Sequence, residues 1–316
     1  MTSALRRGSA GVYSGMITAP ALLVFALFAD GSSAVKPCAP RAIDSLTARI
    51  ESRIAMVPGA RVGVVLHDLK NRFHVEIAAD SSFHAASTMK VPVMIELFRR
   101  ADAGAIALDQ GVLVVNQFGS IVDGSPYALD AGDDSDSTLY AKVGTRVSMR
   151  ELLERMIERS SNLATNTLIA IVGAANTNAT AHALGASRIH VRRGVEDGKA
   201  FQAGLNNTTT ASDLAALMLA IERGGAASPS SCSAMRDILL RQEFSQEIPA
   251  GLPPGTPVAH KTGWITGTRH DAAIVYPPGG TPYVLVVLTS GIAQDDAART
   301  LIADISRMSW EFATSR

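Results

Sequence analysis

Apolar residues recur every three or four positions in several stretches of the chain, which is the spacing of one face of a helix. The spacing is clearest in 41–57, where Ile43, Leu46, Ile50 and Ile54 follow it until a Pro-Gly pair interrupts the pattern. We therefore predict a helix in this segment. The same spacing predicts further helices at 87–100, 148–159, 164–172, 210–223, 232–241 and 301–312.

Short apolar runs rich in β-branched residues predict strands near both ends of the chain. Two of them, 61–69 and 73–78, are separated by Lys70-Asn71-Arg72, which fits a hairpin turn. Later strands are expected at 257–261, 272–276 and 283–289. Strands from both ends can share one mostly antiparallel sheet only if the helical middle of the chain is inserted between them.

The predicted architecture is thus an α/β fold with a five-stranded sheet, terminal helices on one face of that sheet, and an inserted all-α domain. We place the sheet domain at 39–82 plus 247–316 and the inserted domain at 83–246. The length of 316 residues is compatible with two such parts, and an apolar content of 47% is enough for a hydrophobic core.

The charge balance excludes some partners and favours no cofactor. With 29 basic and 29 acidic side chains the formal net charge is zero, which gives no attraction to a nucleic-acid backbone. The seven histidines lack metal-ligand spacing. The acidic segment 130–136 lacks the central Gly and closing Glu of a calcium loop. We read this segment as a solvated loop and expect neither a metal nor another cofactor.

The N-terminus resembles a secretory signal peptide. Arg6 and Arg7 precede the apolar run 20–29, and the small residues of 32–34 fit a cleavage site after Ala34. We expect 1–34 to direct export to the periplasm or the medium. A retained membrane anchor is the alternative, although the first half of the uncharged segment is Gly-rich and polar.

The two cysteines, Cys38 and Cys232, lie far apart in the sequence. An oxidising compartment would permit a disulfide, but two distant cysteines cannot be paired from the sequence alone. Neither of them has a feature that marks a nucleophile.

The first chemically suggestive motif is Ser87-Thr88-Met89-Lys90, where a loop enters a predicted helix. A serine there lies at the positive end of the helix dipole, and a lysine three residues later lies on the same helix face. A partly desolvated lysine can accept the serine proton and so create a nucleophile. A capping serine followed by a surface lysine is the structural alternative.

Two further motifs follow in order along the chain. Ser160-Ser161-Asn162 lies between two predicted helices and offers a hydroxyl for proton transfer and an amide for a substrate carbonyl. Lys261-Thr262-Gly263 lies at the end of a predicted strand and offers an ammonium and a hydroxyl for a substrate carboxylate. Its glycine would let a substrate approach the backbone.

In this order the three motifs resemble the S-x-x-K, S-D-N and K-T-G set of class A β-lactamases and related penicillin-binding proteins. Phe83 and the Thr208-Thr209-Thr210 run also resemble family landmarks, and the chain has no Y-x-N. The resemblance implies a β-lactamase-like (DD-peptidase/transpeptidase-like) fold over nearly all of the chain after residue 34. The two predicted parts would then form one catalytic unit.

The resemblance also implies roles for individual residues. Ser87 would be the acylated nucleophile, Lys90 its proton partner, and Ser160 the donor to the leaving nitrogen. Asn162 would hold a substrate side-chain amide. Lys261, Thr262 and Gly263 would meet the substrate carboxylate, with Arg269 in support, and the backbone N–H groups of Ser87 and Trp264 would form the oxyanion hole.

The sequence departs from the family at two places. Ser161 stands where the family has an aspartate that braces the loop, although a serine can still cap the following helix. The loop that carries E-x-x-x-N in the family is shortened here. One alignment places Gln202, and another Gly194, at the position of the glutamate that activates the deacylating water. Glu196 is the only glutamate in the loop and is our candidate for this base, and Asp197 is the second candidate. The alternative role of Glu196 is that of an exposed ion-pair partner of Arg192 or Arg193.

The resulting hypothesis is an exported, monomeric serine hydrolase that opens β-lactams through an acyl-enzyme on Ser87. One alternative is a D-Ala-D-Ala peptidase or small-ester hydrolase with the same site. Another is a penicillin-binding sensor that is acylated without efficient turnover.

Overall fold

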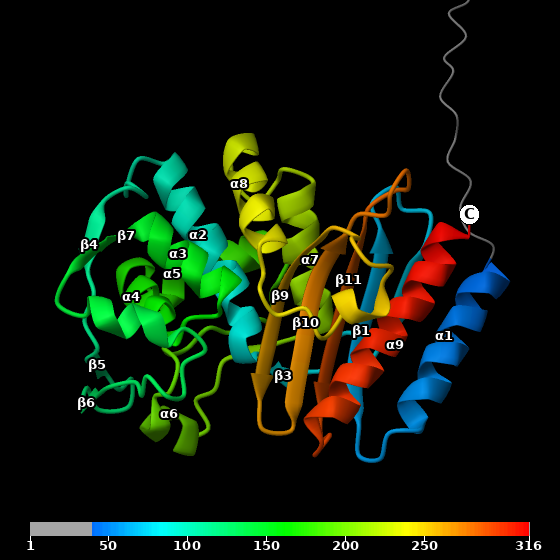
Figure 1. Cartoon of the computed structure of the whole chain (residues 1–316), viewed down its shortest axis with the longest axis horizontal. Coiled ribbons are helices and arrows are strands. Elements are labelled where there is room, and N and C mark those ends of the chain that lie inside the picture. Colours follow the sequence, from blue (N-terminus) through cyan, green and yellow to red (C-terminus); the bar gives the residue numbers. More distant parts are fainter. Residues whose placement is uncertain (1–39, 316) are drawn as a thin grey trace, which may run out of the picture. The chain divides into compact units, whose positions relative to one another are not determined.

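A five-stranded antiparallel sheet forms the middle of the part of the chain that the structure describes (Figure 1). The structure is a computed structural model and describes residues 40–315, so the predicted export signal and Cys38 lie outside it. The strand order is β2-β1-β11-β10-β9. Their bounds are Arg61–Asp68 (β1), His74–Ile77 (β2), Val258–Ile265 (β9), Thr268–Val275 (β10) and Tyr283–Ser290 (β11).

The two ends of the chain meet in this sheet because β1 pairs with β11. The register runs from Arg61 opposite Ser290 to Asp68 opposite Tyr283. The hairpin of β1 and β2 is closed by Asn71, whose φ of 55° is the left-handed conformation that asparagine tolerates. The predicted sheet and its antiparallel pairing are confirmed.

Both faces of the sheet are covered, which explains why its strands read as continuous apolar runs. Helices α1 (Pro40–Ala55) and α9 (Asp295–Thr314) pack on one face, as Figure 1 shows and as the sequence predicts. Leu285 of β11 joins the core under these helices, whereas its neighbour Val286 joins the core under the inserted helices. Helix α7 (Ala211–Glu222) contacts the sheet on that second face.

The inserted segment is mostly helical but not all-α. Its helical elements are η1 (Ala86–Met89), α2 (Lys90–Asp102), η2 (Ser137–Lys142), α3 (Met149–Glu158), α4 (Asn162–Val172), α5 (Ala174–Ala183), α6 (Gly198–Gln202), α7 and α8 (Pro229–Leu240). It also holds three short strand pairs: β3 (Phe83–His84) with β8 (Thr208–Thr209), β4 (Gly111–Leu113) with β7 (Arg146–Ser148), and β5 (Phe118–Gly119) with β6 (Pro126–Tyr127). The predicted boundaries of the two domains stay a prediction. Between residues 40 and 315, no helix is long and apolar enough to cross a membrane.

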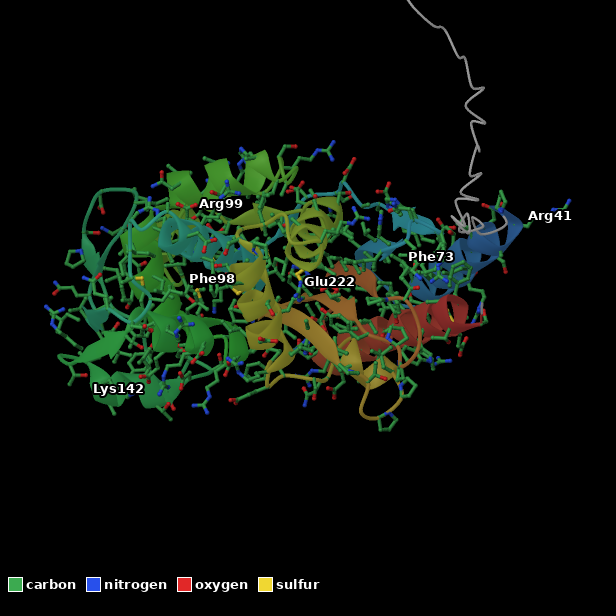
Figure 2. The ribbon with its side chains drawn as sticks, turned by 90° about the horizontal axis from the view of Figure 1, so that it is seen from above. Arg41, Phe73, Phe98, Arg99, Lys142 and Glu222 are labelled. Carbon is green, nitrogen blue, oxygen red and sulfur yellow. The ribbon has the colours of Figure 1, made fainter. Side chains whose placement is uncertain are left out.

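Helix α2 is the central helix of the inserted segment. Every residue from Lys90 to Phe98 is buried, and α3, α4, α5 and α8 contact the helix. In Figure 2 Phe98 marks its C-terminal half. A helix that is buried all round places its first residue, Lys90, in the protein interior.

Candidate active site

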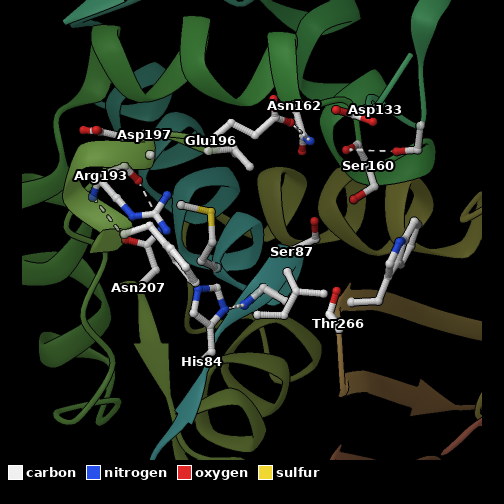
Figure 3. Close-up of a pocket in the computed structure, with 18 residues that line it drawn as sticks. His84, Ser87, Asp133, Ser160, Asn162, Arg193, Glu196, Asp197, Asn207 and Thr266 are labelled. Atoms are coloured by element: carbon white, nitrogen blue, oxygen red, sulfur yellow. Dashed lines mark hydrogen bonds between the residues drawn. The ribbon is translucent and has the colours of Figure 1, made fainter. Parts of the chain in front are cut away.

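The three sequence motifs meet where the inserted helices face β9. Figure 3 shows Ser87 and Ser160, from the first two motifs, at this place. Ser87 comes from η1, Ser160 from the turn between α3 and α4, and Lys261 from β9. A cavity of about 710 Å³ opens at this place, and its lining includes Ser87, Ser160, Asn162, Glu196 and Trp264. The fold therefore brings together groups that are more than 70 positions apart in the sequence.

Lys90 is fully buried beside the second motif. Its Nζ lies 2.5 Å from the Ser160 carbonyl oxygen, 3.1 Å from Ser160 Oγ and 3.0 Å from Asn162 Oδ1. Burial, followed by the nearby Lys261 charge, lowers the pKa of Lys90 well below its usual value. A neutral amine can donate to the two carbonyl oxygens and accept from the Ser160 hydroxyl. Lys90 is thus suited to act as a base.

Lys261 approaches the same hydroxyl from the other side. Its Nζ donates to Ser160 Oγ at 3.1 Å and to the Thr262 carbonyl oxygen at 2.9 Å. Burial lowers the pKa of Lys261 to about 7, against the opposing effect of Asp271 and Glu247. Ser160 Oγ therefore lies between two buried lysines, both with a lowered pKa.

The K-T-G motif is less accessible than the sequence suggests. Lys261 and Thr262 are 0% and 1% exposed and do not line the cavity. Thr262 Oγ1 is buried without a hydrogen-bond partner in 40–315, and a buried hydroxyl is normally paired. Thr262 therefore retains a free donor for a ligand, while Lys261 acts on the site through Ser160.

Gly263 brings β9 against the nucleophile. A Cβ at this position would lie 2.9 Å from Ser87 N and 3.0 Å from Thr88 N, closer than side chains normally approach. Only glycine fits, and the next residue of β9, Trp264, lines the cavity together with Ser87. This arrangement agrees with the expected pair of backbone donors. The Ser87 hydroxyl itself makes no hydrogen bond within 40–315, and Lys90 bonds Ser160 instead.

Strained backbone surrounds the cavity. Ala86, Ser160 and Glu196 are non-glycine residues with φ of 45°, 57° and 61°. Such conformations cost on the order of 1 kcal/mol each and persist where surrounding contacts enforce them. The Ala86 N–H donates to His84 Nδ1 at 3.0 Å, and the Glu196 carboxylate is held by Asn162. All three residues line the cavity, so the surrounding contacts hold its wall in these conformations.

Glu196 is the loop carboxylate that reaches the site. Asn162 Nδ2 donates to its Oε1 at 2.8 Å, so Asn162 bridges Lys90 and Glu196. Desolvation, reinforced by Asp134 and Asp133, raises the pKa of Glu196, while the Asn162 hydrogen bond opposes this shift.

Of the other candidates for the base, only Asp197 lines the cavity. Gln202 is exposed on α6 and does not line the cavity. A Cβ on Gly194 would contact Asn166 and Tyr127. Asp197 is buried and accepts hydrogen bonds from Ser120 Oγ and the N–H groups of 121 and 200, which is a structural role.

Comparison with known proteins agrees with this geometry. Residues 45–313 match the sequence profile of the beta-lactamase enzyme family. The chain belongs to this family. It is 27% identical over 292 residues to beta-lactamase Toho-2 of Escherichia coli, and the aligned region covers 87% of this chain and 95% of that protein. It is 28% identical over 255 residues to beta-lactamase AST-1 of Nocardia asteroides, which covers 79% and 78%.

Solved structures of the family share the fold. The structure of PBP-A has a TM-score of 0.73 and 29% identity, covering 84% of this chain and 95% of that one. A beta-lactamase from Sphaerobacter thermophilus has a TM-score of 0.73 and 26% identity, covering 88% and 99%. The predicted family and fold are confirmed, and the chain is a hydrolase of the serine beta-lactamase type.

Arg269 is a predicted site residue that the structure does not bring to the cavity. It is 4% exposed, and its guanidinium donates to Glu247 Oε1 at 2.7 Å and to Asp295 Oδ2 at 2.8 Å. Its guanidinium carbon also lies 5.7 Å from the centre of the Trp264 ring. Arg269 does not line the cavity of this beta-lactamase-family chain, and its expected support of a substrate carboxylate stays a prediction. The two acidic partners, 22 and 26 positions away, could not be recognised from the sequence.

The acidic loop 130–136 is only partly solvated, because Asp134 and Asp136 are buried, and it supplies a residue that the motif search missed. Asp134 is 7% exposed and accepts hydrogen bonds from the backbone N–H groups of Asn162 at 3.0 Å and Leu163 at 2.9 Å. Asp136 is 3% exposed and paired with Arg155 at 2.9 Å. No spacing rule connects this loop to the second motif. Among residues 40–315, no cluster of His, Cys, Asp or Glu could hold a metal ion.

Ser161 caps α4, as the sequence predicts. Its Oγ accepts a hydrogen bond from the N–H of Ala164 at 3.3 Å, and its φ of −52° and ψ of 122° lie outside the helix. A serine at this position therefore keeps the start of the helix intact where the family has aspartate.

Proposed function

We propose that this protein hydrolyses β-lactams through an acyl-enzyme on Ser87. The observation that carries the proposal is Ser160 Oγ, which lies 3.1 Å from both Lys90 Nζ and Lys261 Nζ at the edge of the cavity that contains Ser87. Neutral Lys90 accepts the proton of the Ser87 hydroxyl as Oγ bonds to the carbonyl carbon. The C–N bond then breaks, Ser160 gives its hydroxyl proton to the leaving nitrogen, and Lys90 passes the proton that it took from Ser87 to Ser160 Oγ.

Two backbone donors stabilise the negative charge that develops on the carbonyl oxygen. The N–H groups of Ser87 and Trp264 are the candidates, since β9 lies directly against η1 at Gly263. Such donors are usually the largest single contribution to acyl transfer. The free hydroxyl of Thr262 is the candidate donor to the substrate carboxylate. A variant of PBP-A solved as an acyl-enzyme complex with penicillin G supports this chemistry in a relative of 29% identity.

We assign deacylation to Glu196. Its carboxylate is oriented by Asn162 and takes a proton from the water that attacks the ester of Ser87. The raised pKa of Glu196 makes it a stronger base than an ordinary glutamate at neutral pH.

A chromogenic cephalosporin separates the possible activities of the purified protein. Many turnovers, lost in Ser87→Ala and kept in Ser82→Ala, support β-lactam hydrolysis, since Ser82 is exposed and lies outside the cavity lining. A burst of one equivalent indicates a penicillin-binding sensor. Ester or D-Ala-D-Ala cleavage without reaction on the cephalosporin indicates a peptidase or esterase. Full activity in Ser87→Ala would refute the assignment of the site.

Replacement of Glu196 tests the second half of the reaction. In Glu196→Gln we expect acylation at close to the native rate and a turnover number lower by about 10²-fold or more, because one general base typically contributes that much. Intact-mass measurement then finds the acyl-enzyme in the steady state. Gln202→Glu is the matched control and gains nothing, because residue 202 lies outside the cavity lining. Equal turnover in native protein and Glu196→Gln would exclude this base.

We also propose export with removal of residues 1–34, which would place the site where β-lactams and peptidoglycan occur. N-terminal sequencing of the protein recovered from the periplasm or medium tests this proposal, and a start at Val35 is the expected result.

A further inference from the structure

Asp134 lies outside α4 but accepts hydrogen bonds from backbone N–H groups in the first turn of this helix. Four N–H groups at the start of a helix have no partner within it. Here those of Asn162 and Leu163 donate to the Asp134 carboxylate. The N–H of Ala164 donates to Ser161 Oγ, and the N–H of Ser161 donates to the Arg155 carbonyl oxygen. The Tyr140 hydroxyl also donates to Asp134, at 3.1 Å.

This carboxylate reaches a turn in which the motif itself has no carboxylate. The chain has Ser161 where the family motif has aspartate, and Asp134 reaches the same turn from 28 positions earlier in the sequence. We propose that Asp134 is the positioning carboxylate of the active site and replaces the aspartate of the family motif. This inference rests on the proposed acylation of Ser87.

The contacts explain how Asp134 acts on the chemistry without touching the substrate. It fixes the backbone of Asn162, whose side chain contacts Lys90 and Glu196. The turn that it holds also contains Ser160 in its left-handed conformation. A second effect is electrostatic, because the Asp134 charge opposes the lowering of the Lys90 pKa. The other charged groups that act on Lys90 are Lys261 and Glu196.

The first test moves the carboxylate from residue 134 to residue 161 and measures the rate at which a fluorescent penicillin acylates the protein. We expect Asp134→Ala to acylate about 10²-fold more slowly, because a displacement on the order of 1 Å in a catalytic group costs that much. Asp134→Ala combined with Ser161→Asp should recover to within about tenfold of the native rate, since aspartate also serves as an N-cap. No recovery in the double variant would overturn the proposal.

The pH profile of acylation is the second test and excludes a purely structural role. Acylation requires neutral Lys90, so its acidic limb follows the Lys90 pKa. Asp134→Asn keeps the volume but removes the charge, so the limb should move to lower pH. Asp136→Asn is the control, because Asp136 is buried in the same loop but pairs with Arg155. The acidic limb of Asp136→Asn should lie at the same pH as that of the native protein, even if this variant is less stable.

An unchanged rate and limb in Asp134→Asn, or an equal shift in Asp136→Asn, would overturn the proposal. If Asp134→Ala does not fold, the profile of Asp134→Asn decides alone. The proposed function fails differently, because the native protein would then not be acylated at all, and the inference would fall with it. Native acylation with unaffected Asp134 variants refutes only the inference.

Discussion

Gly263→Ala tests whether acylation requires the close approach of the edge strand β9 to Ser87. The added methyl group would lie 2.9 Å from Ser87 N and 3.0 Å from Thr88 N, whereas ordinary contacts begin at 3.4 Å. Both neighbours are backbone atoms, so no side chain can rotate away. Strand β9 must therefore retreat by about 0.5 Å from η1, and the N–H groups of Ser87 and Trp264 separate by a similar amount.

The expected loss is larger in activity than in stability. Overpacking of this kind costs about 1–3 kcal/mol of unfolding free energy. Loss of one oxyanion donor costs about 10²–10³ in the rate of acylation, and a separation of this size should approach that loss. We expect Gly263→Ala to be acylated at least about 10²-fold more slowly, with a fall in stability that leaves the protein folded at 25 °C.

Stopped-flow acylation and urea unfolding measure the two effects on the same samples. Two glycines provide matched controls. Gly225 is exposed, and its nearest atom to an added Cβ is 3.8 Å away, so Gly225→Ala should change neither quantity. An added Cβ on Gly251 would overlap the Ala303 carbonyl oxygen, far from the cavity, so Gly251→Ala should lose stability and keep its acylation rate.

An acylation rate of Gly263→Ala equal to that of the native protein would refute the reasoning, because the close approach of β9 would then have no role in the chemistry. A rate loss of equal size in Gly251→Ala would also refute it, since destabilisation alone would explain both variants.

Two further predictions concern the buried charges near β9. Because the pKa of Lys261 is about 7 in the folded protein and near 10.5 when unfolded, the native unfolding free energy should rise with pH from about 7 towards 10.5. Lys261→Met should lose this pH dependence and should no longer be acylated. Below pH 7 its unfolding free energy in urea titrations should be higher than that of the native protein. A pH slope equal to that of the native protein would contradict this prediction. Arg269→Gln removes the 2.7 Å partner of buried Glu247 and leaves it only the 4.0 Å contact with Arg299, so we expect a loss of about 3 kcal/mol in urea unfolding. Its KM for a cephalosporin should stay within about twofold of the native value, and a KM raised tenfold or more would return Arg269 to substrate binding.

The long amphipathic and apolar segments were predictable because local periodicity determines them. The helix at 87–100 and the strand at 283–289 correspond to α2 and β11, since a buried element needs an uninterrupted apolar pattern. Helix α5 was not predicted. Its sequence offers only alanines as apolar residues, and just Thr177 and Ala181 are buried, so its pattern has no distinct face.

The site was predictable as far as its chemistry is written in contiguous motifs. Ser87, Ser160 and Asn162 line one cavity as expected, and Glu196 is the loop carboxylate that reaches it. The resemblance to the family suggested Arg269 for the site, whereas no motif records its acidic partners Glu247 and Asp295, which lie 22 and 26 positions away.

The sequence by itself determined the element order, the antiparallel sheet with its inserted helices, and the candidate nucleophile with its neighbouring motifs. Tertiary structure decided burial and partnership. It placed Lys90 and Lys261 around one hydroxyl, where desolvation lowers both pKa values. It also brought Asp134 to the turn at Ser161, because a hydrogen bond depends on distance in space, and a local motif cannot record a partner 28 positions away.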